Sequence, residues 1–152
     1  YLSSLAGVSL PVWLLPAMLF VLAGLMAFAT GTSWGTFGIM LPLAGDMVMH
    51  ADPHLLMASL AAVLAGAVFG DHCSPIFDTT ILSSTGAGCH HIDHVMTQLP
   101  YALFVAAGSL VAYVVYGLLA SLWFAYLVAG LWFALLLALL FMRRRVLTPA
   151  EA

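Results

Sequence analysis

Long apolar runs cover most of this chain and constrain its fold more than any other feature. Hydrophobic residues make up 64% of the sequence and charged residues only 6%, whereas a soluble domain carries about 25% charged residues. Since a helix needs about 20 apolar residues to cross a bilayer, the chain has room for about five or six crossings or half-crossings. The sequence therefore predicts an all-α, polytopic membrane protein with a single membrane domain over residues 1–152.

The apolar runs divide the chain into helical segments of different lengths. Pro100–Leu119 and Leu122–Met142 are long enough for two full transmembrane helices. The first run, Leu10–Ala29, reaches the glycine- and hydroxyl-rich segment Thr30–Thr36 and resumes as Phe37–Met49. Because each arm of this pair is short, we expect a re-entrant hairpin with its tip at membrane depth. A single kinked helix is the alternative.

Two polar segments are predicted to lie outside the apolar helices. Ala44–His54 is expected to be a surface loop with solvated aspartates and histidines, and Cys89–Gln98 is expected to be a short polar connection. The helix His54–Phe69, between them, reaches the glycine pair Gly66 and Gly70. GxxxG spacing lets two helix backbones approach closely, so we interpret this pair as a packing device.

Pro75 is expected to break the helix that precedes it. Proline has no N–H to donate, and it disfavours helical geometry at the residue before it, here Ser74. The chain should unwind around Asp71–Pro75 and restart as a half-helix over Ile76–Ser84. Irregular backbone at membrane depth is tolerated only where protein buries it or water reaches it. The break therefore marks a candidate site.

Two carboxylates, Asp71 and Asp78, flank this break. A charged side chain at the centre of a transmembrane helix costs about 2.5–3.5 kcal/mol on insertion scales, and it usually serves an ion or proton pathway. Half-helix ends and free carbonyls at such breaks bind ions in transporters. The structural alternative is that the aspartates cap the two half-helices.

Hydroxyl-bearing residues surround the two carboxylates. Together they form a set of hard oxygen donors, which suits Na⁺ or H⁺ better than a soft metal. The alternative is that these hydroxyls bond to carbonyls of their own helix. The hydroxyl residues near the break are Ser74, Thr79, Thr80, Ser83, Ser84 and Thr85.

Other classes of function have less support in the sequence. His90 and His94 are four residues apart, which would allow a metal site, but we interpret them as interfacial. A membrane metal- or haem-binding protein stays as the rival hypothesis, with the ligands Cys73, His72, Cys89, His90 and His94. No Walker loop, nucleophile elbow or HExxH motif occurs in the sequence, so we predict neither an enzyme nor a cofactor. The lack of a basic stripe argues against nucleic-acid binding.

A family resemblance lies in four segments, Thr30–Pro42, Gly70–Pro75, Asp78–Gly88 and Thr97–Ala102. They resemble the NhaC-type Na⁺/H⁺ antiporter family of the ion-transporter superfamily. The resemblance implies a transporter with two inverted repeats, hairpins and broken helices. It also implies that this chain is the C-terminal part of a polypeptide several times longer, whose N-terminal repeat is missing here.

The resemblance implies secondary exchange of Na⁺ for H⁺. Burial favours a protonated carboxyl group, so a proton and Na⁺ would compete for one carboxylate. We expect Asp78 to be the principal ligand and proton carrier, and Asp71 to be a second carboxylate that also carries protons or gates the site. The candidate oxygen ligands are Thr79, Thr80 and Ser84, joined by Thr32 and Ser33 from the hairpin tip.

Several further expectations concern partners and location. Arg143–Arg145 follow the last apolar run, so the positive-inside rule places the C-terminus in the cytoplasm. We also expect a multi-pass protein of the inner cell membrane. The partners would be membrane lipid, Na⁺, H⁺ and the missing repeat, and a homodimer is left open. Without that repeat the fragment is expected to be inactive. An organic-anion exchanger of the malate/lactate type, with the half-helix start at Ile76–Thr80 facing a carboxylate, is the alternative transporter.

Overall fold

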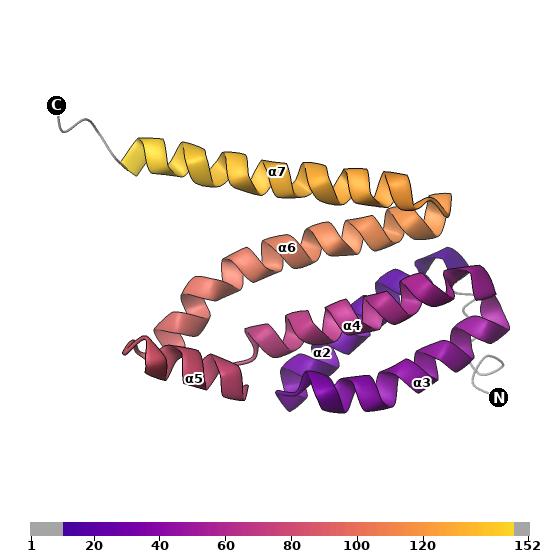
Figure 1. The fold of residues 1–152 in the computed structure, drawn as a ribbon, viewed down its shortest axis with the longest axis horizontal. Coiled ribbons are helices and arrows are strands. Elements are labelled where there is room, and N and C mark those ends of the chain that lie inside the picture. Colours follow the sequence, from indigo (N-terminus) through magenta and orange to yellow (C-terminus); the bar gives the residue numbers. More distant parts are fainter. Residues whose placement is uncertain (1–10, 148–152) are drawn as a thin grey trace.

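The computed structural model describes residues 11–147, with side chains described over residues 11–142. Over this range the regular elements are all helical, which confirms the predicted all-α class. The elements are η1 (Val12–Leu14), α2 (Leu15–Thr30), α3 (Ser33–Ala51), η2 (Pro53–Leu55), α4 (Leu56–Cys73), α5 (Asp78–Gly86), α6 (His91–Leu119) and α7 (Leu122–Leu147). Figure 1 shows α2, α3 and α4 gathered on one side and the antiparallel pair α6 and α7 on the other.

Four helical segments of the described chain are long and apolar enough to cross a membrane. They are Val12–Thr30, Pro53–Cys73, His91–Leu119 and Leu122–Met142. The two full helices predicted at the end of the chain are among them. These four segments establish a multi-pass membrane protein.

The prediction of a polar connection over Cys89–Gln98 is wrong, because α6 already begins at His91. Polarity alone does not stop a helix when the polar side chains can face outward. Asp93 lies in the first turn of α6, where a negative charge interacts favourably with the N-terminal end of the helix dipole. Thr97 bonds back to the carbonyl of Asp93 at 2.8 Å, so its hydroxyl is satisfied within the helix.

The prediction of a surface loop over Ala44–His54 is also wrong, because α3 continues through this segment to Ala51. The segment is amphipathic: Ala44 and Val48 are fully buried, whereas Asp46 and His50 lie one turn apart on the exposed side. The exposure of Asp46 and His50 agrees with the solvation that we expected for them. The apolar face of this segment packs into the core and keeps the segment helical.

The turn between α2 and α3 is only two residues long. Gly31 has a left-handed backbone with φ 66°, a conformation that glycine adopts without strain. Thr32 then caps α3 by accepting a hydrogen bond from the N–H of Gly35 at 3.4 Å. The first arm, Val12–Thr30, is long enough to cross the membrane, so the expectation of two short arms is wrong for α2. The re-entrant arrangement stays a prediction.

A very close backbone contact joins α2 and α4 at the glycine pair. A Cβ added to Gly66 would lie 2.1 Å from the carbonyl oxygen of Phe20, and one added to Gly70 would lie 1.9 Å from that of Gly24. Only glycine fits at such separations. The predicted packing role of the GxxxG pair is thus confirmed, and it fixes the last turns of α4 against α2.

Candidate ion-binding site at the helix break

The predicted break in the helix is present, although it lies a few residues further along. α4 remains helical to Cys73 and α5 begins at Asp78, so Ser74–Phe77 lie outside both helices. Ser74 has an extended backbone with ψ 128°, which is the conformation expected before a proline. Pro75 therefore ends the helix directly before itself, and the residues from Asp71 to Cys73 remain in the last turn of α4.

Ser74 ties the break to the end of α2. It is fully buried, and its hydroxyl donates to the carbonyl oxygen of Phe28 at 3.0 Å. Phe28 is in the last turn of α2, where carbonyls have no partner within the helix. The same Ser74 oxygen accepts from the N–H of Ile76 at 3.4 Å. One side chain thus satisfies polar groups of both the helix end and the break.

We expect Ser74→Ala to lower the free energy of unfolding by about 1–3 kcal/mol, because it removes the fully buried hydroxyl that donates to the carbonyl of Phe28. The measurement is an SDS titration of the purified chain in mixed micelles, followed by tryptophan fluorescence. Ser83→Ala makes the same change at an exposed serine of α5 and should have little effect. Equal stabilities for the two variants would show that the Ser74 bond contributes nothing.

Asp71 is the buried carboxylate of the break. Its side chain is 4% exposed, and among the described residues its Oδ1 atom has no hydrogen-bond partner. It lies in the last turn of α4, where the helix dipole places partial negative charge. The structure thus places at the break a buried carboxylate with one oxygen atom that makes no hydrogen bond to the described residues.

Asp78 has a different environment. It is exposed at the start of α5, and its Oδ1 accepts a hydrogen bond from the N–H of Thr79 at 2.7 Å. A carboxylate in this position satisfies an N–H that has no partner within the helix and interacts favourably with the helix dipole. This contact agrees with the structural alternative for Asp78, in which it caps a half-helix.

The predicted hydroxyl ligands divide into buried and exposed groups. Thr80 and Ser84, one turn apart on α5, are 4% and 2% exposed, whereas Thr79 is exposed. Ser33 is buried at the start of α3 and Thr32 before it is partly buried.

The turn that carries Thr32 lies against the break, since a Cβ on Gly31 would approach Cγ1 of Ile76 to 2.8 Å. The fold thus brings the α2–α3 turn next to the break. An ion site with ligands from both segments requires this arrangement.

His91, which the sequence pattern did not indicate, joins the break to α5. Its Nε2 atom lies 2.7 Å from the carbonyl oxygen of Pro75, and its Nδ1 atom lies 3.1 Å from Oγ of Ser84. Residue spacing had pointed instead to His90, which is exposed, and to His94, which is partly buried. No local signal distinguishes His91, because its contact with Pro75 spans 16 residues.

The metal-binding alternative receives no support from this geometry. Within the part of the chain whose side chains are described, no three His, Cys, Asp or Glu side chains are grouped so that they could hold a metal ion. Cys73 is buried and Cys89 exposed, and both are free thiols. The proposed ligands therefore do not form one site.

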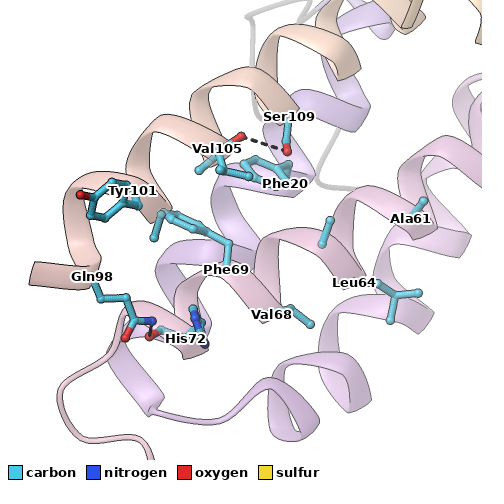
Figure 2. A pocket seen from close by; sticks show the side chains of 13 residues that line it. Phe20, Ala61, Leu64, Val68, Phe69, His72, Gln98, Tyr101, Val105 and Ser109 are labelled. Carbon is cyan, nitrogen blue, oxygen red and sulfur yellow. Dashed lines mark hydrogen bonds between the residues drawn. The ribbon is translucent and has the colours of Figure 1, made fainter. Parts of the chain in front are cut away.

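An apolar groove of about 880 Å³ lies beside the break. Figure 2 shows His72 and Gln98 at one end of it and Ser109 at the other. At the polar end, the amide of Gln98 donates to the carbonyl oxygen of His72 at 3.1 Å. None of the predicted ion ligands lines this groove, and it is thus separate from the candidate ion site.

Comparison with known proteins gives one family. The profile of the Na⁺/H⁺ antiporter family matches residues 1–118. A protein of Haemophilus influenzae described as uncharacterized is 63% identical over 117 residues, which cover 77% of this chain and 22% of that protein. No solved structure matches the chain.

Other relatives carry transporter names. An uncharacterized Na⁺/H⁺ antiporter of Haemophilus influenzae is 39% identical, with 71% of this chain and 23% of the relative covered. An arginine/ornithine antiporter of Halobacterium salinarum is 37% identical, with 72% of this chain and 23% of that protein covered. A malate-2H⁺/Na⁺-lactate antiporter of Bacillus subtilis gives a weaker match, 37% over 82 residues, with 52% and 17% covered. The chain thus spans less than a quarter of the length of these relatives.

Proposed function

This chain belongs to the Na⁺/H⁺ antiporter family, and we propose that it supplies the ion-binding part of a secondary antiporter that exchanges Na⁺ for H⁺. In this proposal Asp71 is the principal ligand and proton carrier. Asp78 takes the second role, close to the N-terminus of α5. The ranking of the two aspartates differs from the one expected from the sequence, because Asp71 is buried and Asp78 is exposed.

The observation that carries the proposal is the unpartnered carboxylate oxygen of Asp71. A buried polar group without a partner costs free energy, and a buried charge costs far more. The protonated carboxyl group removes the charge, and a bound Na⁺ compensates it. Since one carboxylate cannot hold both at once, occupancy by a proton and by Na⁺ is mutually exclusive.

The remaining oxygen donors would come from three places. The last turn of α4 ends in backbone carbonyls, which coordinate cations at broken helices of other transporters. Thr80 and Ser84 offer buried hydroxyls from α5, and Thr32 and Ser33 offer hydroxyls from the α2–α3 turn. Thr79 stays in the candidate set as an exposed donor. These hard oxygens fit Na⁺ rather than a transition metal.

Alternating access would convert this competition into exchange. A proton released on one side of the membrane frees the carboxylate for Na⁺, and Na⁺ released on the other side frees it for a proton. We further propose an inverted N-terminal repeat in the longer polypeptide, an inner-membrane location and a cytoplasmic C-terminus next to Arg143–Arg145. The isolated chain is then inactive, because it lacks half of the cavity.

The test is Na⁺-driven proton movement in everted vesicles that contain the full-length protein, followed with a pH-sensitive dye. We expect addition of Na⁺ to release protons from acid-loaded vesicles, and vesicles without the protein to give the background. Proton movement that requires malate or lactate and ignores Na⁺ would overturn the proposal in favour of organic-anion exchange.

Organic-anion exchange has less support from the geometry. It requires the start of α5 to face a substrate carboxylate, but Asp78 already accepts the N–H of Thr79 there. A second negative charge at this position would be repelled by the first. We therefore keep it only as an outcome of the test above.

A further inference from the structure

We propose that His91 is the positioning residue of the ion site, and that it holds α5, with its buried hydroxyls, against the helix break. This inference rests on the proposed function, because it assigns Thr80 and Ser84 to the site that binds Na⁺. It goes further by naming a side chain that itself touches no ion. The residue lies in the first turn of α6, on a different helix from every predicted ligand.

The two ring nitrogens of His91 join two backbone segments that have few other contacts. A carbonyl oxygen only accepts, so the Nε2 atom of His91 must carry the hydrogen that it shares with Pro75 at 2.7 Å. In the neutral ring the Nδ1 atom then accepts the hydroxyl hydrogen of Ser84 at 3.1 Å. The imidazole thus acts as a clamp between the non-helical segment and α5.

The clamp matters because α5 makes few contacts with α4, and most of its other bonds are to the residues that directly precede and follow it. It is a short helix of nine residues, below the length at which an isolated helix is stable. Its N-terminal end follows the break, and its C-terminal end leads through Gly88, which has φ 63°, into α6. Without His91, the contact from α6 to the carbonyl of Pro75 would be lost.

The bond to Ser84 also orients its oxygen. The hydroxyl lies 2.9 Å from the carbonyl of Ile81 in its own helix and 3.1 Å from His91. It has one hydrogen and can donate to only one of them at a time. With either acceptor the two lone pairs of the Ser84 oxygen remain available to a cation. The contact with His91 fixes where this oxygen lies relative to the break.

The first experiment compares His91 variants of the full-length protein in everted vesicles. His91→Ala and His91→Phe remove both hydrogen bonds, and His91→Gln keeps a donor that can reach Pro75. We expect the KM for Na⁺ to rise about tenfold or more in the first two, as is usual when a residue that orients ligands is lost. His91→Gln should show a smaller rise, and the maximal rate per folded protein should change by less than the KM.

The matched control is His90, the exposed neighbour at the N-cap of α6. His90→Ala should leave the KM for Na⁺ unchanged. A residue that merely stabilises the fold would lower the amount of active protein and would not move the KM. The proposal is overturned if wild-type protein exchanges Na⁺ for H⁺ and His91→Ala keeps the wild-type KM, or if His90→Ala raises the KM equally.

A second measurement needs no transport and separates this inference from the proposed function. In the purified full-length protein, with its native cysteines (Cys73 and Cys89 among them) replaced, a cysteine is placed at buried Thr80 and its reaction with a thiol reagent is timed. Loss of two hydrogen bonds should speed labelling about tenfold in His91→Phe, while His90→Phe should not change it. If wild-type protein shows no Na⁺-dependent proton movement, the proposed function fails. In that case faster labelling in His91→Phe still supports the clamp, and a labelling rate equal to that of the parent overturns it.

Discussion

Replacing Asp71 with asparagine is expected to reduce Na⁺-driven proton movement in the full-length protein to the background of vesicles without it. Asparagine keeps the shape of the side chain but offers no negative charge to Na⁺ and no carboxyl group to protonate. Removing one partner of a buried ion pair costs about 3–5 kcal/mol, which corresponds to more than about a hundredfold in affinity. The measurement is dye-reported proton release on addition of Na⁺.

Misfolding would not explain such a loss. In the absence of Na⁺, the buried Oδ1 of Asp71 has no partner among the described residues, so neutralising this side chain should leave stability unchanged or raise it. Asp46→Asn is the matched control, because Asp46 is an exposed carboxylate on α3, and it should exchange at the wild-type rate. Asp78→Asn is expected to reduce exchange by less than Asp71→Asn. Full activity in Asp71→Asn would remove the basis of the proposed mechanism.

Gly70→Leu is expected to destabilise the fold more strongly than Ser74→Ala does. A Cβ at this position would lie 1.9 Å from the carbonyl oxygen of Gly24 and 2.9 Å from the backbone nitrogen of Phe28. Both opposing atoms belong to the backbone of α2, so no side chain can turn away. Overpacking of a core costs about 1–3 kcal/mol and sometimes more. We expect a loss of more than about 3 kcal/mol in the SDS titration.

The control for this substitution is Gly38→Leu on α3. A Cβ at Gly38 meets no atom within 4 Å, and replacing a helical glycine with a good helix former gains up to about 1 kcal/mol. This variant should therefore be as stable as wild type or slightly more stable. If Gly70→Leu unfolds at the same SDS fraction as Gly38→Leu, the close contact between α2 and α4 does not hold the fold together.

The Gly70 contact also matters for the candidate site. Gly70 lies one residue before Asp71, so a backbone shift at this contact would also move the buried carboxylate.

The sequence predicted the break because its cause is local. Pro75 lacks an N–H and restricts Ser74, and neither effect depends on the rest of the molecule. The same holds for the close approach at Gly66 and Gly70, since four-residue spacing of glycines produces a flat helix surface wherever it occurs. These two features locate the candidate site.

Polar segments were harder to predict from composition. Ala44–His54 was expected to be a loop because it holds charged and polar residues, yet it is mostly helical. What keeps it helical is burial of Ala44 and Val48 against the core, and burial depends on which helices lie nearby. Local composition shows that a face is polar but not that the opposite face has a partner.

The sequence by itself determined that this chain is a helical membrane protein, that one helix breaks at Pro75 and that two carboxylates flank the break. Each of these follows from apolar length or from the covalent chemistry of proline. Only the tertiary structure decided that Asp71 is buried while Asp78 is exposed, and that His91 reaches back to Pro75. The physical reason is that burial and hydrogen-bond partners depend on contacts between helices, which no local pattern of residues specifies.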